Sequence, residues 1–265
     1  MNAQPLASYA SFMGHGMRLL AGVAAVLGCG SACSVDDVIG TRLSSGGAGG
    51  VSEAGSDAAS SDPNCVDTLF CSSFAEGLAS FDVVESGGTL SIDPSGLDDQ
   101  AALHAAIDEG GGAANIRVNL TTSNVSTIYL RAYMWVGSSQ QLDDISIFFL
   151  GPSVAGAGLA VGLRSSERIE LFWAEHQLSL MSAPGAFLRE TWQCLQLSLL
   201  VDATNGEATL LIDGDAVVSQ SDIDSNLGGD LAYLNFGIEW SAGAQVPVEI
   251  LLDDVILSQT PVECL

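Results

Sequence analysis

Apolar residues in the carboxyl-terminal part of the chain recur at every second position, in short stretches that turn residues separate. The clearest stretch places Leu195, Leu197, Leu199 and Val201 on one side of an extended backbone. Successive side chains of a β-strand point to opposite faces, so this period of two predicts strands with one buried face. No convincing amphipathic helix lies between the stretches. The chain is therefore expected to be all-β, with two packed antiparallel sheets.

Turn signals divide the remaining stretches into strands. Asn205-Gly206 is a hairpin signal, and residues 212–215 form a second predicted turn before a strand that begins at 216. The other predicted strands are residues 81–84, 89–92, 115–120, 127–136, 145–150, 157–163, 168–174, 208–212, 231–239 and 248–257.

Residues 97–107 conflict with this pattern. They have helical propensity and follow Ser95, a residue suited to capping a helix. Taken alone they predict a short helix. Their position inside a series of strands makes a strand the alternative, because tertiary context overrides propensity.

Three sequence segments carry a resemblance to a known fold family. Residues 192–195 begin with Trp and are followed by a strand that ends in Asp213-Gly214, and residues 250–257 contain Asp-Asp-Val. This resembles the central hairpin and closing strand of laminin-G-like jelly rolls, members of the concanavalin A-like lectin/glucanase fold. Residues 69–74 resemble the opening segment of bacterial members, with serines in place of two aspartates. The resemblance implies a two-sheet antiparallel jelly-roll sandwich over residues 65–265.

The amino terminus has the organisation of an export signal. Residues 19–27 are apolar and follow Arg18, and they are shorter than the roughly 20 residues that span a bilayer. Residues 26–29 resemble the lipobox of bacterial lipoproteins, which implies a signal peptide over residues 1–28 and a lipid on Cys29. The true start could be Met17. The alternative is an ordinary signal peptide that is cut near Ser31-Ala32.

Residues 29–64 are predicted to be a flexible tether. The stretch 43–63 is rich in Gly, Ser and Ala and cannot bury enough apolar area to offset the entropy of ordering. Gly30, not an aspartate, follows Cys29. By resemblance to Gram-negative lipoproteins, we expect a lipid-anchored protein of the outer membrane, with secretion as the alternative.

The cysteines also indicate an oxidising compartment. Four lie in the predicted domain: Cys65, Cys71, Cys194 and Cys264. An even number is typical of disulfide-bonded domains, and four cysteines permit three connectivities. We favour Cys65–Cys71 with Cys194–Cys264, and the other two pairings stay open. No Cys/His spacing suits zinc.

Charge excludes one class of partner and suggests one cofactor. Seven arginines face 32 acidic residues, for a net charge of −25, and such a surface repels nucleic acid. Solubility is the simpler interpretation of this acidity. Asp253, Asp254 and Asp213 are the candidates for a calcium site, because calcium prefers carboxylate and carbonyl oxygens.

The resemblance implies that a sheet face is the glycan platform. Tyr129, Arg131, Tyr133 and Trp135 share one face of their strand, where aromatic rings can stack on sugars and the guanidinium can bind hydroxyls or a carboxylate. The simpler interpretation is that these aromatics fill the sandwich. Residues on other strands that are expected to add to this strip are His176, Tyr233 and Asn235, with Glu170, Gln196, Ser198 and Glu239 as further candidates.

These features predict a cell-surface lipoprotein whose domain binds a carbohydrate or another envelope or extracellular ligand without catalysis. The Glu-x-Asp-x-x-Glu motif of the glucanase branch is absent, as is a Gly-x-Ser-x-Gly elbow. The first alternative is a glycoside hydrolase or lyase on the same fold. The second is a structural protein of the envelope.

Overall fold

The computed structural model describes residues 65, 67–108, 111–122, 124–138, 142–245 and 247–264. The predicted signal peptide, lipidation site and tether, residues 1–64, lie outside the described residues. The strands of the described part are β1 (Thr68–Ser72), β2 (Asp82–Ser86), β3 (Gly88–Asp93), β4 (Ala102–Ile107), β5 (Ala113–Asn119), β6 (Thr127–Val136), β7 (Asp144–Pro152), β8 (Leu159–Arg164), β9 (Arg168–Trp173), β10 (Leu178–Met181), β11 (Gln193–Leu200), β12 (Gly206–Ile212), β13 (Asp215–Ile223), β14 (Leu231–Ser241) and β15 (Val248–Ser258).

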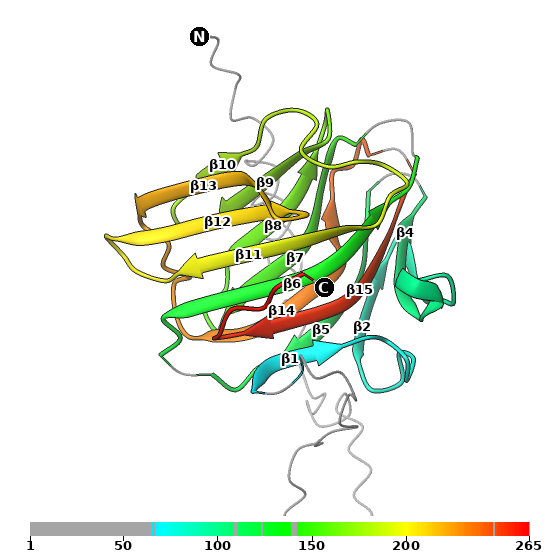
Figure 1. Ribbon diagram of the computed structural model, residues 1–265, viewed down its shortest axis with the longest axis horizontal. Helices are drawn as coiled ribbons and strands as arrows, with labels where there is room; N and C mark the ends of the chain where they lie inside the picture. Colours follow the sequence, from blue (N-terminus) through cyan, green and yellow to red (C-terminus); the bar gives the residue numbers. More distant parts are fainter. Residues whose placement is uncertain are drawn as a thin grey trace, which may run out of the picture. The chain divides into compact units, whose positions relative to one another are not determined.

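The strands form two antiparallel sheets that pack face to face (Figure 1). Sheet A has the order β13-β12-β11-β6-β15-β4-β3, and β1 also pairs with β15. Sheet B has the order β10-β9-β8-β7-β14-β5-β2. Strands far apart in the sequence are neighbours in both sheets, as in β6–β15 and β7–β14. The predicted all-β sandwich is thereby confirmed.

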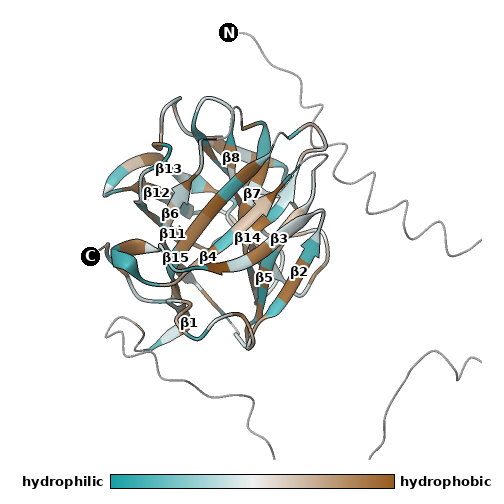
Figure 2. Ribbon diagram, turned by 90° about the vertical axis from the view of Figure 1, so that its right-hand side faces the viewer, coloured by the Kyte–Doolittle hydropathy of each residue, from teal (hydrophilic) through white to brown (hydrophobic). Residues whose placement is uncertain are grey.

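The core lies between the sheets and is built by the alternation seen in the sequence. Leu195 and Leu197 of β11 are at most 1% exposed, and so are Phe148 of β7 and Phe236 of β14 from the other sheet. Figure 2 shows brown, hydrophobic stretches along strands of the sandwich, β7 among them. One face of each sheet is thus apolar, and the opposite face carries the polar positions.

The segment with helical propensity is mainly a strand. A single 3₁₀ turn spans Leu97–Asp99, and β4 follows directly. Strand β4 pairs with β3 and β15, and its Leu103 and Ala105 are fully buried in the core. The expectation of a helix, taken from the segment alone, is wrong. Burial between two strands outweighs a propensity of a few tenths of a kcal/mol per residue.

The predicted turn at residues 212–215 is a two-residue hairpin loop. Ile212 pairs with Asp215, and Asp213 and Gly214 between them have φ values of 51° and 84°. Two positive φ angles give the strands of such a hairpin their right-handed twist. Aspartate and glycine are among the residues that adopt this conformation most readily.

The last residues, 259–264, leave β15 and return across the outer face of sheet A; we call them the C-terminal segment (Figure 1). A disulfide joins Cys264 of this segment to Cys194 of β11, and a second joins Cys65 to Cys71. This is the favoured connectivity of the three. No helix within the described ranges is long and apolar enough to cross a membrane.

Candidate functional site

Polar side chains gather on the outer face of sheet B where β5 and β14 pair. Asn235 lies opposite Arg117 in the register of these strands, and Tyr233 lies opposite Asn119. The intervening Leu234 is fully buried in the core. Alternation therefore directs Arg117, Tyr233 and Asn235 to the outer face.

Arg117 and Tyr233 are in direct contact on this face. The guanidinium carbon of Arg117 lies 4.0 Å from the centroid of the Tyr233 ring, a cation–π contact. The Nε of Arg117 donates to Oδ1 of Asn235 at 3.2 Å. Phe149 of β7 stacks with Tyr233 at 6.0 Å between ring centroids and an interplanar angle of 27°. The guanidinium and the two rings thus form one continuous, half-exposed surface.

A glycine makes this arrangement possible. Gly151 of β7 pairs with Tyr233, and a Cβ at Gly151 would lie 2.0 Å from Cζ of the tyrosine ring. The ring therefore occupies the space that any other residue at position 151 would fill. Gly151 lets Tyr233 lie across β7 beside Phe149.

Glu239 of β14 adds a carboxyl group to the same face. Burial raises its pKa to about 7, while Arg117 and a hydrogen bond from the Asn235 side chain act in the opposite direction. The carboxyl is thus divided between its protonated and ionised forms near neutral pH. We call Arg117, Phe149, Tyr233, Asn235 and Glu239 the β5–β14 cluster.

An unused acceptor lies beside the cluster. Asn115 is opposite Gly237 and only 3% exposed, and its Nδ2 donates to the carbonyl of Ile238 at 3.5 Å. Its Oδ1 has no hydrogen-bond partner among the described residues. Buried polar atoms are seldom left unpaired, and a bound water is one reason for an exception.

A second set of polar side chains on sheet B consists of charges that pair with one another. Arg164 of β8 forms ion pairs with Asp144 at 2.7 Å and with Glu170 at 2.5 Å. All three residues are at most 8% exposed. Burial raises the pKa of Asp144 to about 6, against the attraction of Arg164. Ser179 of β10 donates a hydrogen bond to Glu170. These buried charges pair with one another, which suits a structural role.

The predicted strip on β6 lies on the other sheet. Tyr129, Arg131, Tyr133 and Trp135 share the outer face of sheet A, and the alternate residues of β6 face the core. Arg131 is fully buried and Tyr133 is 7% exposed. The strip is therefore partly covered.

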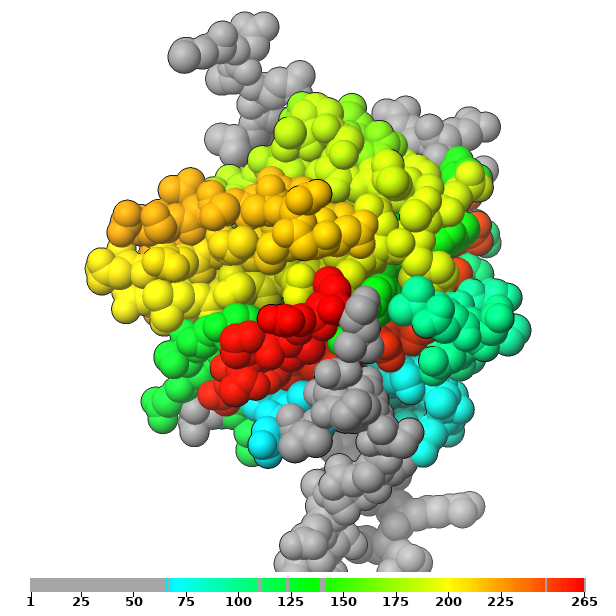
Figure 3. Space-filling view, in the orientation of Figure 1, coloured from blue at the N-terminus to red at the C-terminus, as the bar shows by residue number. Residues whose placement is uncertain are grey.

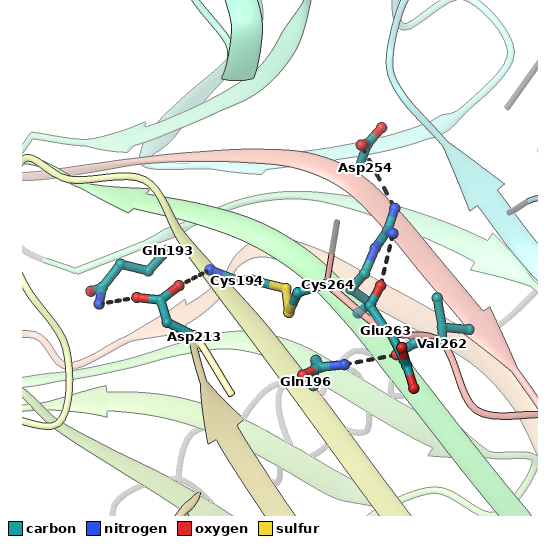
Figure 4. The surroundings of a disulfide bond; sticks show 9 residues. Gln193, Cys194, Gln196, Asp213, Asp254, Val262, Glu263 and Cys264 are labelled. Atoms are coloured by element: carbon teal, nitrogen blue, oxygen red, sulfur yellow. Dashed lines mark hydrogen bonds and ion pairs between the residues drawn. A yellow bond between two sulfur atoms is a disulfide. The ribbon is translucent and has the colours of Figure 1, made fainter. Parts of the chain in front are cut away.

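The cover over the strip is the C-terminal segment (Figure 4). Arg131 donates from Nη1 to the carbonyl of Glu263 at 3.1 Å, and its Nη2 lies 3.6 Å from Asp254. Gln196 of β11 donates to the carbonyl of Val262 at 2.8 Å. Backbone carbonyls of the C-terminal segment thus accept hydrogen bonds from Arg131 in the predicted strip and from Gln196 beside it.

The structure divides the predicted site residues between the two sheets. Gln196 and Ser198 lie beside the strip, opposite Arg131 and Tyr129. Tyr233, Asn235, Glu170 and Glu239 belong to sheet B. His176 lies in the turn between β9 and β10, with Nε2 3.3 Å from the carbonyl of Asn226 and 3.4 Å from Asp224. The predicted residues do not form a single strip.

The predicted calcium ligands are engaged within the protein. Asp213 accepts hydrogen bonds from the Cys194 amide and the Gln193 side chain, both at 2.8 Å. Asp253 accepts from the amides of Leu97 and Asp254, at 3.1 and 2.7 Å. Within the described ranges, no three His, Cys, Asp or Glu side chains gather as a metal site would require.

Two members of the β5–β14 cluster, Arg117 and Phe149, were not among the residues predicted from the sequence. A signal for Arg117 was present, because Asn115, Arg117 and Asn119 alternate with apolar residues within one predicted strand. Phe149 belongs to an apolar run in which no such alternation is visible. Its outward direction follows a register shift of β7, located between Ser146 and Phe148 where it pairs with β8.

The sandwich belongs to the class of concanavalin A-like jelly-roll folds. The cellulose induced protein Cip1 is similar to it with a TM-score of 0.55 and 18% identity, over 74% of this chain and 99% of that one. An endo-β-1,4-glucuronan lyase from the fungus Trichoderma reesei has a TM-score of 0.50 and 11% identity, over 74% and 92%. These identities show the fold alone. No protein-family model and no curated protein matches the sequence.

A third similar structure comes from a toxin. It is a structure of botulinum neurotoxin type C, whose entry into cells depends on interaction with two ganglioside molecules. Its TM-score is 0.51 at 11% identity, and the match covers 69% of this chain and 44% of that one. This chain thus corresponds to less than half of the toxin chain.

Proposed function

We propose that the domain binds a glycan through the β5–β14 cluster. The observation that carries this proposal is the half-exposed surface made by Phe149, Tyr233 and the Arg117 guanidinium. Aromatic faces stack on the C–H surface of sugar rings, and guanidinium, amide and carboxyl groups hydrogen-bond to hydroxyls. Asn235 and Glu239 supply these polar groups at the edge of the rings.

The names of structurally similar proteins support a saccharide ligand. One acts on a glucuronan, one is induced by cellulose, and one depends on gangliosides for cell entry.

Arg117 makes no ion pair with any carboxylate of the described residues, unlike Arg131, Arg164 and Arg189. It is therefore available to a ligand. The face of sheet B is favoured over the predicted strip on β6 because Arg131 is buried.

A panel of immobilised glycans tests the proposal directly. We expect Tyr233→Ala and Arg117→Ala to weaken binding of the best glycan about tenfold each, since such contacts are worth on the order of 1 kcal/mol or more. Arg168→Ala is the control, because Arg168 is a half-buried arginine of the same sheet that contacts Met181. If all three variants bind as well as the wild type, the β5–β14 cluster is not the site.

A polysaccharide-active enzyme is the second candidate, and Glu239 favours it. A carboxyl with a pKa of about 7 suits a general acid. Asp82 of β2 lies opposite Arg117, so it supplies a second carboxyl on the same outer face. Release of reducing ends or unsaturated products from a polysaccharide, abolished by Glu239→Gln, would establish this candidate. Binding without release supports the first.

We also propose that the protein is exported and anchored to the outer membrane by a lipid on Cys29. The support is the apolar run at residues 19–27, the lipobox-like residues that end at Cys29, and the tether that follows. Wild-type protein should partition into detergent after membrane extraction. Cys29→Ser should remain aqueous or unprocessed. Equal partitioning of both would favour plain secretion.

A further inference from the structure

A depression of about 440 Å³ lies on the outer face of sheet A, opposite in the sandwich to the β5–β14 cluster. Its floor is formed by Tyr129 of β6, Gln196 and Ser198 of β11 and Leu211 of β12. One wall is the β12–β13 turn at Asp213 and Gly214, and the other is the C-terminal segment. Figure 3 shows this segment, in red, lying on the face that the yellow and green strands form.

The wall is fixed in place by covalent and polar contacts. The Cys194–Cys264 disulfide holds its end, and Gln196 and Arg131 donate hydrogen bonds to the carbonyls of Val262 and Glu263 (Figure 4). On the opposite side, the Asp213 carboxylate accepts from the amide of Cys194 at 2.8 Å. Both walls are therefore tied to β11, and the depression is preorganised rather than a loose gap between loops.

The lining favours a neutral polar ligand. It contains the carboxylates of Asp213 and Glu263 and no arginine, lysine or histidine, so an anion would be repelled. Two carboxylates are too few for a metal site, and no group of three is present among the described residues. The volume lies within the range of about 300–1,000 Å³ that is typical of small-molecule sites.

The hydrogen-bonding groups are of the kind that sugars use. Ser198 lies directly opposite Tyr129 in the strand register, and both are half-exposed. None of the hydrogen bonds between described residues uses either of these two hydroxyls. Gln196 donates from Nε2 to the segment, which leaves its Oε1 as an acceptor. A half-exposed tyrosine with donors and acceptors beside it matches a pyranose, which presents C–H faces and hydroxyls.

We infer that this depression is a second saccharide site, for a neutral mono- or disaccharide unit, and that its wall depends on the Cys194–Cys264 disulfide. The two sites use opposite outer faces of the sandwich and share no residue. One domain can then hold two glycan chains, or two parts of one chain, and gain avidity. The inference does not rest on the β5–β14 cluster, because a different sheet and different residues carry it.

Titration calorimetry with neutral gluco-, manno- and galacto-configured disaccharides tests the inference on the exported protein. Tyr129→Ala should weaken binding at this site about tenfold, and Ser198→Leu should fill the depression and abolish the site. Arg168→Ala serves as the control and should leave this site unchanged, because Arg168 lies on sheet B and lines neither site. Unaltered disaccharide binding in both Tyr129→Ala and Ser198→Leu would overturn the inference.

A second measurement examines the wall and the ligand class. The double variant Cys194→Ser/Cys264→Ser, shown to be folded by circular dichroism, should lose this site and keep any binding that Tyr233→Ala removes. Retention of the Tyr129-dependent binding in that variant would contradict the role of the wall. Spermidine is the competing probe. Binding of spermidine but of no disaccharide would show that the depression takes an organic cation and not a saccharide.

Discussion

Arg131 donates a hydrogen bond of 3.1 Å from its guanidinium Nη1 to the backbone carbonyl of Glu263. The C-terminal segment therefore covers this cation on the outer face of sheet A. Arg131 is fully buried, and its Nε has no hydrogen-bond partner among the described residues. Asp254 at 3.6 Å and the Tyr133 ring at 5.6 Å balance the charge. The Cys194–Cys264 disulfide and the hydrogen bond from Gln196 to the carbonyl of Val262 also hold this cover in place.

The two disulfides should contribute unequally to stability. Cys194–Cys264 closes a loop with a sequence separation of 70 residues, and Cys65–Cys71 closes one of 6. Loop-closure entropy gives roughly 4 kcal/mol for the first and roughly 2 kcal/mol for the second. Urea unfolding of the two Cys→Ser double variants measures this difference. A larger loss from the short loop would show that strand β1 matters more than the C-terminal segment.

Gly151→Ala should displace the Tyr233 ring without unfolding the domain. The new Cβ would lie 2.0 Å from Cζ of the ring, so the ring must rotate away from Phe149 and Arg117. We expect glycan binding to fall about tenfold, as in Tyr233→Ala, and the double variant to be no weaker than either single variant. Affinities from calorimetry complete this cycle. Additive losses would mean that Gly151 acts independently of the tyrosine.

Removing the cation at position 164 should strongly destabilise sheet B. Arg164→Met leaves the buried carboxylates of Asp144 and Glu170 without their shared partner, a loss of about 3–5 kcal/mol. Arg168→Met, at the start of β9, is the control and should change the free energy of unfolding by no more than about 0.5 kcal/mol. Chemical denaturation of both variants gives the comparison. If both variants lose equally little free energy of unfolding, the ion pairs of Arg164 do not stabilise the fold.

Asp253 should make stability fall as the pH rises. Burial raises the pKa of its carboxyl from 3.8 to about 7, although hydrogen bonds from the Asp254 and Leu97 amides and the charge of Arg131 oppose the shift. The folded protein therefore holds this proton more tightly than the unfolded chain. The stabilisation is complete below about pH 4 and is lost as the pH rises through 7.

The pKa values of Asp144 and Glu239 are raised as well, so these groups also make stability depend on pH. Comparison with Asp253→Asn isolates the contribution of Asp253, because the other two groups are present in both proteins. Between pH 5 and 7, wild type should lose stability relative to the variant with a slope approaching ~1.4 kcal/mol per pH unit. Denaturant unfolding at several pH values provides the data. A difference that is constant with pH would show that the carboxyl titrates normally.

Alternation was enough to predict the class of fold. The period of two along β6 and β11 specified which residues face the core, and those residues are buried. The structure of residues 102–107 could not be predicted in this way, because their sequence is compatible with both a helix and a strand. Pairing with β3 and β15, distant in the sequence, decided in favour of the strand.

By itself, the sequence determined the parity of each strand: which residues share a face, and hence that Tyr129, Arg131, Tyr133 and Trp135 lie together. It could not determine what lies above that face, because parity is a local property of the backbone and cover depends on contacts between distant segments. Only the tertiary structure brought residues 259–264 over Arg131 and placed Tyr233 and Asn235 beside Arg117 on the other sheet. The same alternation that predicted the sandwich therefore left open which of its two outer faces can hold a ligand.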